Sequence, residues 1–163
     1  MRYIRKYKIF ESNSREEEIL DNMRDILISL KVDHYIRVFI RSEVEEFGKV
    51  RISFRIEGVI GLDEVLTISH LDSYLRSEEI ESAVIATGTD TNKKDELYVV
   101  VQKKHGQLTQ YPLSKLIKLL SNNLNKEVIG LTRIDFQYYL PDYIRFYHGE
   151  RGKFFKIGNL IEL

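Results

Sequence analysis

The chain has 163 residues, enough for one domain with a core of its own, and we take residues 1–163 as a single globular unit. Its 25 basic residues balance 25 acidic ones, which excludes a globally basic nucleic-acid binder but not a local basic patch. The absence of cysteine excludes disulfides, thiolate metal sites and cysteine nucleophiles. No apolar run approaches the roughly 18 residues of a membrane span, and the basic start lacks a secretory signal. We therefore expect a cytoplasmic protein without a membrane partner.

The first twelve residues, Met-Arg-Tyr-Ile-Arg-Lys-Tyr-Lys-Ile-Phe-Glu-Ser, are basic, then apolar, then end in Phe-Glu. Residues 1–13 are thus either a first strand or a leader. The segment resembles a short leader on many proteins of large tailed bacteriophages, in which a prohead protease cuts after Ile/Leu-x-Glu, and Ile9-Phe10-Glu11 has that form. The resemblance implies a phage-encoded protein in the host cytoplasm or the virion. The segment lacks the second phenylalanine of that pattern, and the resemblance does not extend to residues 14–163.

A helix is predicted over residues 14–31. Ser14-Arg-Glu-Glu17 has the form of a capping box, in which a serine and a glutamate satisfy each other's backbone amides. Apolar residues follow at helical spacing, at Ile19, Met23, Ile26, Leu27 and Leu30.

Residues 49–57 alternate between apolar and polar side chains without a fault, and residues 35–41 follow the same period of two with Ile36, Val38 and Ile40 inward. The two runs predict a β-hairpin. One face of the hairpin is then apolar. The other carries five basic residues beside two aromatic rings, namely Tyr35, Arg37, Phe39, Arg41, Lys49, Arg51 and Arg55. Like charges on one sheet face repel, so this face needs an explanation.

Gly58 and Gly61 predict a bend or bulge after this hairpin. A helix is expected over residues 63–81, then a second hairpin that pairs residues 83–87 with 97–102. Pro112 should be the first residue of a helix that continues over residues 113–120. Further elements expected are a strand over residues 131–140 and a third hairpin that pairs 143–147 with 153–157 around the turn 148–152.

The mixture of helices and neighbouring strands predicts an α+β fold with a mostly antiparallel sheet and about three helices. The order strand–helix–strand–strand–helix–strand over residues 2–88 suits a ferredoxin-like core. Residues 89–163 would then add hairpins to that core.

The chain offers little catalytic chemistry. None of its histidines has a second histidine or a carboxylate at a convincing metal-ligand spacing; they are His34, His70, His105 and His148. Adjacent carboxylates such as Asp63 and Glu64 are typical of a solvated helix face. We expect no catalytic residue, metal or cofactor, although the sequence leaves an enzyme open.

The polar face of the first hairpin is one candidate binding surface, for a polyanion. Arginine forks bind phosphate oxygens, and exposed aromatic rings can stack on unpaired bases. The candidate residues are Arg37, Phe39, Arg41, Arg51 and Arg55. In the alternative interpretation the face packs under another element, and the nearby glutamates neutralise the arginines.

The second candidate surface is the C-terminal region, where eight of the eighteen aromatic residues fall within residues 136–155, interleaved with arginine and lysine. Tyrosine and arginine are favoured at interface hot spots. The candidate residues are Tyr139, Tyr143, Arg145, Phe146, Tyr147 and Phe154. An aromatic core whose edge strands are protected by lysine and arginine explains the same pattern.

These patterns favour a non-enzymatic interaction protein that binds a protein partner or a second copy through its aromatic C-terminal hairpin. The alternative is a module that binds single-stranded nucleic acid or a nucleotide through the arginine-rich face. A third hypothesis is an inhibitor of a host enzyme.

Overall fold

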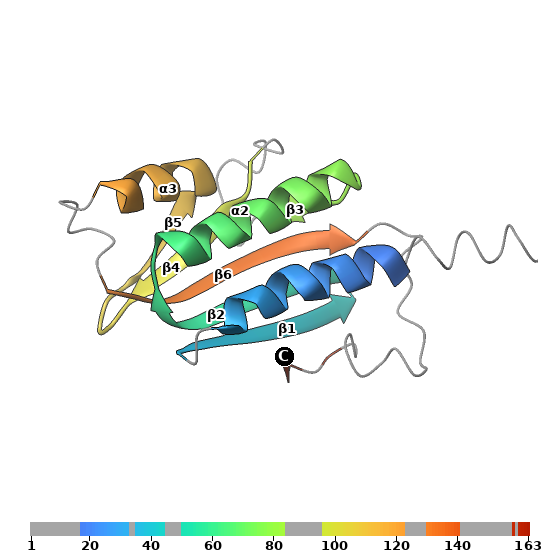
Figure 1. Cartoon of the computed structure of the whole chain (residues 1–163), viewed down its shortest axis with the longest axis horizontal. Helices are drawn as coiled ribbons and strands as arrows, with labels where there is room; N and C mark the ends of the chain where they lie inside the picture. The colour runs from blue at the N-terminus through green and yellow to red at the C-terminus, as the bar shows by residue number, and fades with distance from the viewer. Residues whose placement is uncertain are drawn as a thin grey trace, which may run out of the picture.

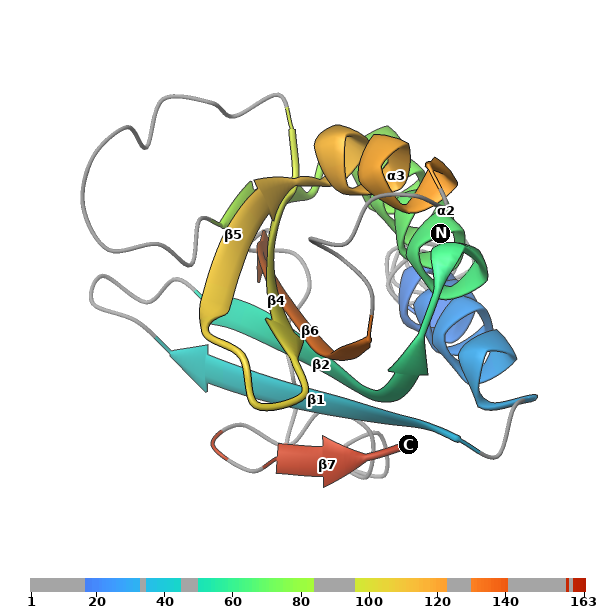
Figure 2. The same ribbon diagram turned by 90° about the vertical axis from the view of Figure 1, so that its left-hand side faces the viewer.

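The computed structural model describes residues 17–32, 35–44, 50–83, 96–122, 130–140, 158 and 160–163. In these residues seven strands form one antiparallel sheet, and three helices lie together on one of its sides (Figures 1 and 2). The fold is therefore α+β, as predicted. In this part of the chain no helix is both long enough and apolar enough to cross a membrane.

The helices are residues 17–29, continued by the 3-10 turn Leu30–Val32 (η1), then α2 (Leu62–Ser77) and α3 (Leu113–Ser121). The strands are β1 (Ile36–Val44), β2 (Val50–Ile60), β3 (Glu81–Ala83), β4 (Tyr98–Lys103), β5 (Leu108–Pro112), β6 (Leu131–Leu140) and β7 (Leu160–Glu162). Their order across the sheet is β5-β4-β6-β2-β1-β7, and β3 pairs with β6 beside this path.

The predicted first hairpin is confirmed by β1 and β2, which pair antiparallel from Ile36↔Gly58 to Val44↔Val50. Gly58 has a φ of 138°, and a side chain there would place its Cβ 1.8 Å from the carbonyl oxygen of Tyr35. The register of β2 against β6 shifts between Glu57 and Ile60, which confirms the predicted bulge. A residue with a side chain would therefore clash at position 58 with the backbone that leads into β1.

The core lies between the sheet and the helices. Alternate side chains of β1, β2 and β6 point into it, and the helices contribute residues at the predicted spacing, such as Met23, Leu27 and Leu71. Phe54 and Phe136 stack with their ring centroids 5.0 Å apart. Burying an apolar side chain of this size stabilises the fold by roughly 1.5–3 kcal/mol, so this alternation fixes which face of the sheet is left for solvent.

One expected element, the second hairpin, is wrong, and one strand was missed. β3 and β4 do not pair with each other, because both lie antiparallel along the same edge of β6, at residues 137–139 and 131–135 respectively. The hairpin partner of β4 is instead β5, a strand that was not predicted. The turn between them contains His105, whose φ of 61° reverses the chain.

Two element boundaries differ from the prediction. α2 ends at Ser77 rather than residue 81, because Glu79 adopts a φ of 61° and Ile80 donates its amide to the carbonyl of Leu75. Pro112 is the last residue of β5 and precedes α3 instead of being its first residue.

The ferredoxin-like core is not confirmed, because the place beside β2 is taken by β6 from the second half of the chain. The proposed first strand or leader lies outside the described residues, and so does the hairpin expected over residues 143–157.

Candidate functional site

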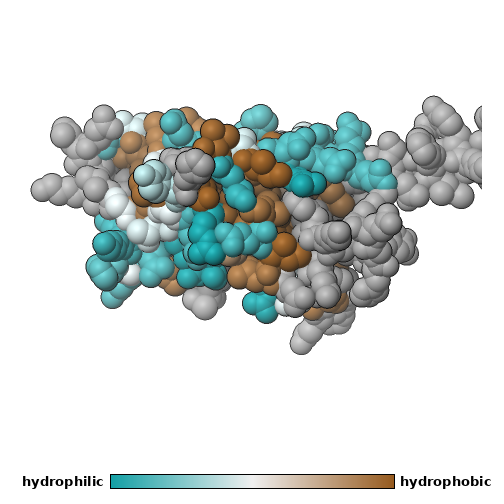
Figure 3. All heavy atoms as spheres, turned by 60° about the horizontal axis from the view of Figure 1, so that its bottom comes forward, coloured by the Kyte–Doolittle hydropathy of each residue, from teal (hydrophilic) through white to brown (hydrophobic). Residues whose placement is uncertain are grey.

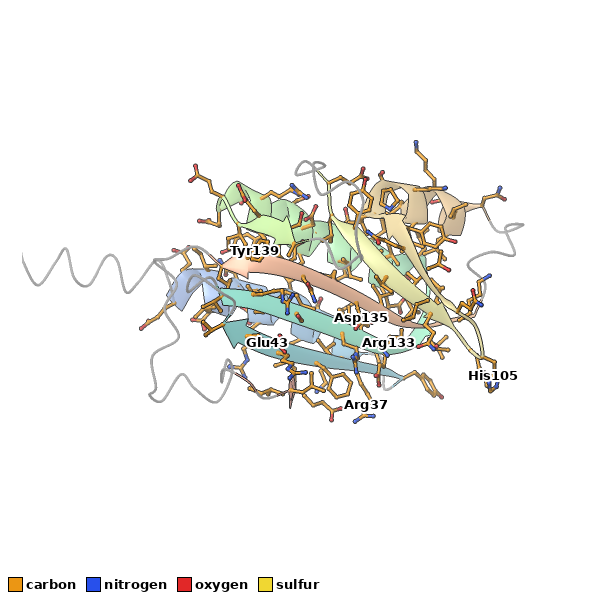
Figure 4. All side chains as sticks on the ribbon, turned by 180° about the vertical axis from the view of Figure 1, so that it is seen from behind. Arg37, Glu43, His105, Arg133, Asp135 and Tyr139 are labelled. Atoms are coloured by element: carbon orange, nitrogen blue, oxygen red, sulfur yellow. The ribbon has the colours of Figure 1, made fainter. Side chains whose placement is uncertain are left out.

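The side of the sheet opposite the helices carries charged and polar residues from β1, β2 and β6 (Figure 4). They alternate with the core residues, so burial of one face dictates the composition of the other. The labelled Glu43, Arg133 and Asp135 belong to this surface. We call it the open face, because no helix of the described residues covers it.

Two arginine–carboxylate–arginine triads organise the open face. In the first, Glu43 lies between Arg41, at 2.7 Å, and Arg51, at 2.9 Å. It joins β1 to β2. Ion pairs of this exposure contribute about 0–1 kcal/mol each, so the triad acts mainly by holding its guanidinium groups in place.

In the second triad, Asp135 lies between Arg55, at 3.0 Å, and Arg133, at 2.6 Å. It joins β2 to β6, and a weaker contact of 4.0 Å links Arg55 to Glu57. The side chain of Asp135 is 17% exposed, less than either arginine, so the carboxylate is the inner member and the guanidinium groups face outward.

A groove of about 340 Å³ runs across the open face and includes both triads. Four arginines and two carboxylates line it, an excess of two positive charges in a protein whose net charge is zero. Ser53 and Gln137, paired in register, lie on its floor. The buried Oε1 of Gln137 has no hydrogen-bond donor among the described residues. The groove therefore presents positive charge at two places and an unused acceptor between them.

The predicted polyanion site is brought together only in part. Arg41, Arg51 and Arg55 line the groove, whereas Arg37 and Phe39 do not. Arg37 makes two hydrogen bonds, of 2.8 and 3.0 Å, to Glu162 of β7, and its guanidinium lies 4.9 Å from the ring centroid of Phe39. Arg37 holds the pKa of Glu162 below its ordinary value of 4.5, first through the hydrogen bond. Arg37 is thus occupied in fastening β7.

Seen from the side that carries β1 and β7, hydrophobic residues lie in patches between hydrophilic ones (Figure 3). Leu160 of β7 is 50% exposed. It pairs in register with Arg41 and borders the groove.

The candidate protein interface is described at only one position. Tyr139 lies on β6, in register with Arg51 of β2 and Glu81 of β3. The remaining predicted interface residues are Tyr143, Arg145, Phe146, Tyr147 and Phe154, and all five lie outside the described residues.

Sequence reasoning did not identify Asp135, Gln137 and Glu162 as members of the site. The signal in β6 was present, since Arg133, Asp135 and Gln137 alternate with buried residues in the same way as the arginines of β2. The alternation does not show which strand pairs with β6. Only the pairing of β6 with β2 shows that Asp135 lies opposite Arg55.

The described histidines, His70 and His105, are both exposed. In the described ranges no three His, Cys, Asp or Glu side chains are grouped so that they could hold a metal ion. The chemistry that this face does offer is charge and hydrogen bonding to a ligand.

Comparison of the chain with protein-family models, with curated proteins and with solved structures found no match.

Proposed function

We propose that this protein is a non-enzymatic binding module whose open face receives an acidic segment of a partner protein. The observation that carries the proposal is the groove with its excess of two positive charges. Because each triad holds its guanidinium groups before a ligand arrives, little side-chain freedom is lost on binding.

The guanidinium groups retain donors for such a ligand. Among the described contacts, Arg41 and Arg133 reach their carboxylates through Nε. A guanidinium has five N–H donors, so the Nη groups of these two arginines remain for a carboxylate of the partner. Charge-assisted hydrogen bonds of this kind are the strong ones, and their geometry favours a planar anion.

A protein partner fits the groove better than single-stranded nucleic acid. Non-specific binders of single strands stack bases on exposed aromatic rings. The phenylalanines that border the groove, Phe54 and Phe136, are buried. The groove is bordered instead by the aliphatic Val100, Leu108 and Leu160, which suit apolar side chains of a polypeptide. Nucleic acid remains the second candidate, supported by the same positive charge.

The test is selection from a displayed library of random nonapeptides on the wild-type protein, with counter-selection on the variant Arg51→Gln/Arg55→Gln. We expect enrichment of acidic peptides that bind the wild type and not the variant, with affinity that falls as salt is added. The proposal is wrong if the enriched peptides bind both proteins equally, or if labelled oligothymidylate binds the groove and no peptide does.

The aromatic C-terminal interface stays a separate prediction. Association through it should tolerate salt and should fail in Tyr143→Ser/Phe146→Ser, whereas binding in the groove should be unaffected by that variant. Light scattering after size-exclusion chromatography, at low and high salt, distinguishes the two surfaces.

A further inference from the structure

The two triads lie at a fixed spacing along one strand. Arg51 and Arg55 are four residues apart on β2 and share the open face. A strand rises about 3.3 Å per residue, so the two positions are separated by about 13 Å. Each lining carboxylate is already shared by two arginines, so an incoming anion meets two guanidinium groups at each end, although Glu57 lies 4.0 Å from Arg55 at the second.

We infer that the partner segment is extended and carries two acidic residues at positions i and i+4. This inference rests on the proposed function of the groove. In an extended chain such residues point to the same side and lie about 13 Å apart, which matches the spacing of the triads. Residues at i and i+2 would be about 7 Å apart and could reach only one triad at a time.

The middle of the groove specifies a further feature of the ligand. Residue i+2 of the segment faces the same side as the acidic residues, so it lies over the pair Ser53 and Gln137. The buried Oε1 of Gln137 lacks a donor among the described residues, and an unsatisfied buried acceptor is costly. A side chain with an N–H or O–H donor, such as Gln, Asn, Ser or Thr, satisfies it.

The two sides of the groove, on β7 and β5, add apolar contacts. Leu160 is in register with Arg41 of the first triad. Leu108 is in register with Gln102, which in turn pairs with Arg133 of the second triad. Both leucines are at least half exposed, at 50% and 56%. Leu160 lies beyond β1 at the level of Ser53, and Leu108 lies beyond β4 at the level of Glu57, so the two leucines border the segment on its long sides. The segment therefore has the pattern acidic–donor–acidic with single spacer residues.

The experiment uses defined peptides and fluorescence anisotropy on the full chain. The test peptide is Leu-Thr-Glu-Val-Gln-Val-Glu-Thr-Leu. The control has the same composition with the glutamates at i and i+2, Leu-Thr-Glu-Val-Glu-Val-Gln-Thr-Leu. A third peptide replaces the central glutamine of the test peptide by valine. We expect the control to bind about tenfold more weakly, the effect of losing one charge-assisted contact, and the valine peptide to be weakened as well.

Protein variants test whether the preference for the i, i+4 spacing depends on the groove. Arg51→Gln and Arg55→Gln should each remove the preference for the i, i+4 spacing, whereas Arg24→Gln, at an exposed position of the helix 17–29 and outside the groove, should keep it. Circular dichroism of each variant shows that the fold is retained. If an arginine variant does not fold, the peptide comparison on the wild type still decides the matter.

Each failure has its own outcome. Equal binding of both glutamate peptides, lost in the groove variants, overturns the spacing and leaves the protein-binding function standing. Peptide binding that the groove variants do not change overturns both. Binding of oligothymidylate in place of the peptides assigns the groove to nucleic acid, and binding of neither overturns a linear segment as the ligand.

Discussion

Tyr138 donates a hydrogen bond from its hydroxyl to Oδ1 of Asp72 over 2.6 Å, and so joins β6 to α2. Asp72 also accepts two hydrogen bonds from Nε of Arg76, at 3.1 and 3.0 Å. The Tyr138 side chain is fully buried, and a buried phenol needs a partner for its hydroxyl. A polar contact thus fixes how the helix crosses the sheet.

Removal of this hydroxyl should destabilise the protein without changing its fold. Tyr138→Phe keeps the ring and its packing but leaves Asp72 with one partner fewer. A hydrogen bond to a charged group contributes about 1.5–3 kcal/mol, so we expect a loss of that size in the free energy of unfolding. Denaturant titration measures it. Tyr98→Phe is the control, because the Tyr98 hydroxyl makes no hydrogen bond among the described contacts; equal losses in both variants would contradict the assignment.

The same tyrosine should make the protein sensitive to alkali. Burial, together with the charge of Asp72, raises the pKa of Tyr138 well above its ordinary value of 10.0. Above pH 10 the unfolded chain loses this proton while the folded chain keeps it, so the free energy of unfolding falls as pH rises. The contribution of one such group approaches about 1.4 kcal/mol per pH unit.

Comparison of two proteins isolates that contribution. Other tyrosines and lysines titrate in both proteins, so their effect on stability cancels in the comparison. Between about pH 9 and pH 11 the free energy of unfolding should therefore fall more steeply in the wild type, which has Tyr138, than in Tyr138→Phe. Parallel curves would show that Tyr138 ionises normally in the folded state.

Gly58 should tolerate no side chain. Its φ of 138° is one that L-residues rarely adopt, and an added Cβ would lie 1.8 Å from the Tyr35 carbonyl oxygen. That atom is backbone and cannot move aside without distorting β1. We expect Gly58→Ala to cost about 3 kcal/mol or more.

Gly130 provides the matched control for this prediction. Its φ is also positive, at 78°, but a Cβ there would meet nothing within 4 Å. Gly130→Ala should cost only the conformational term of about 1–2 kcal/mol. Thermal and chemical unfolding of both variants compares the two; equal destabilisation would show that the close approach at Gly58 relaxes.

Features that depend on residues close together in the sequence could be predicted, whereas features that depend on distant residues could not. The β1–β2 hairpin was predictable because alternation sets both faces and a short loop sets the register. β5 was missed because its residues, Leu-Thr-Gln-Tyr-Pro, show no alternation and none of them is buried. The neutralisation of Arg55 was missed because Asp135 is 80 residues away, and no local pattern reports which distant strand becomes a neighbour.

β7 should be held on β1 by an ion pair that acid removes. Its ladder with β1 is short, with three residue pairs from Phe39↔Glu162 to Arg41↔Leu160. Two main-chain bonds flank this ladder: Leu163 donates its amide to the carbonyl of Val38, and Gly158 donates to that of Ser42. Glu162, with its lowered pKa, stabilises this pairing while it is charged. The stabilisation is present above its ordinary pKa of 4.5 and is lost as pH falls through the lowered value.

Amide hydrogen exchange, expressed as protection factors, tests this directly at Leu163. At neutral pH Glu162→Gln should reduce the protection of this amide, and as the pH falls below 4.5 the wild type should approach the level of the variant. Glu43→Gln is the control, because Glu43 lies on β1, the strand that β7 pairs with, but its ion pairs are with Arg41 and Arg51. Amides between β2 and β6 should keep their protection throughout. Unchanged protection of Leu163 in Glu162→Gln at neutral pH would mean that the main-chain bonds and the packing of Leu163 hold β7 without the help of Arg37.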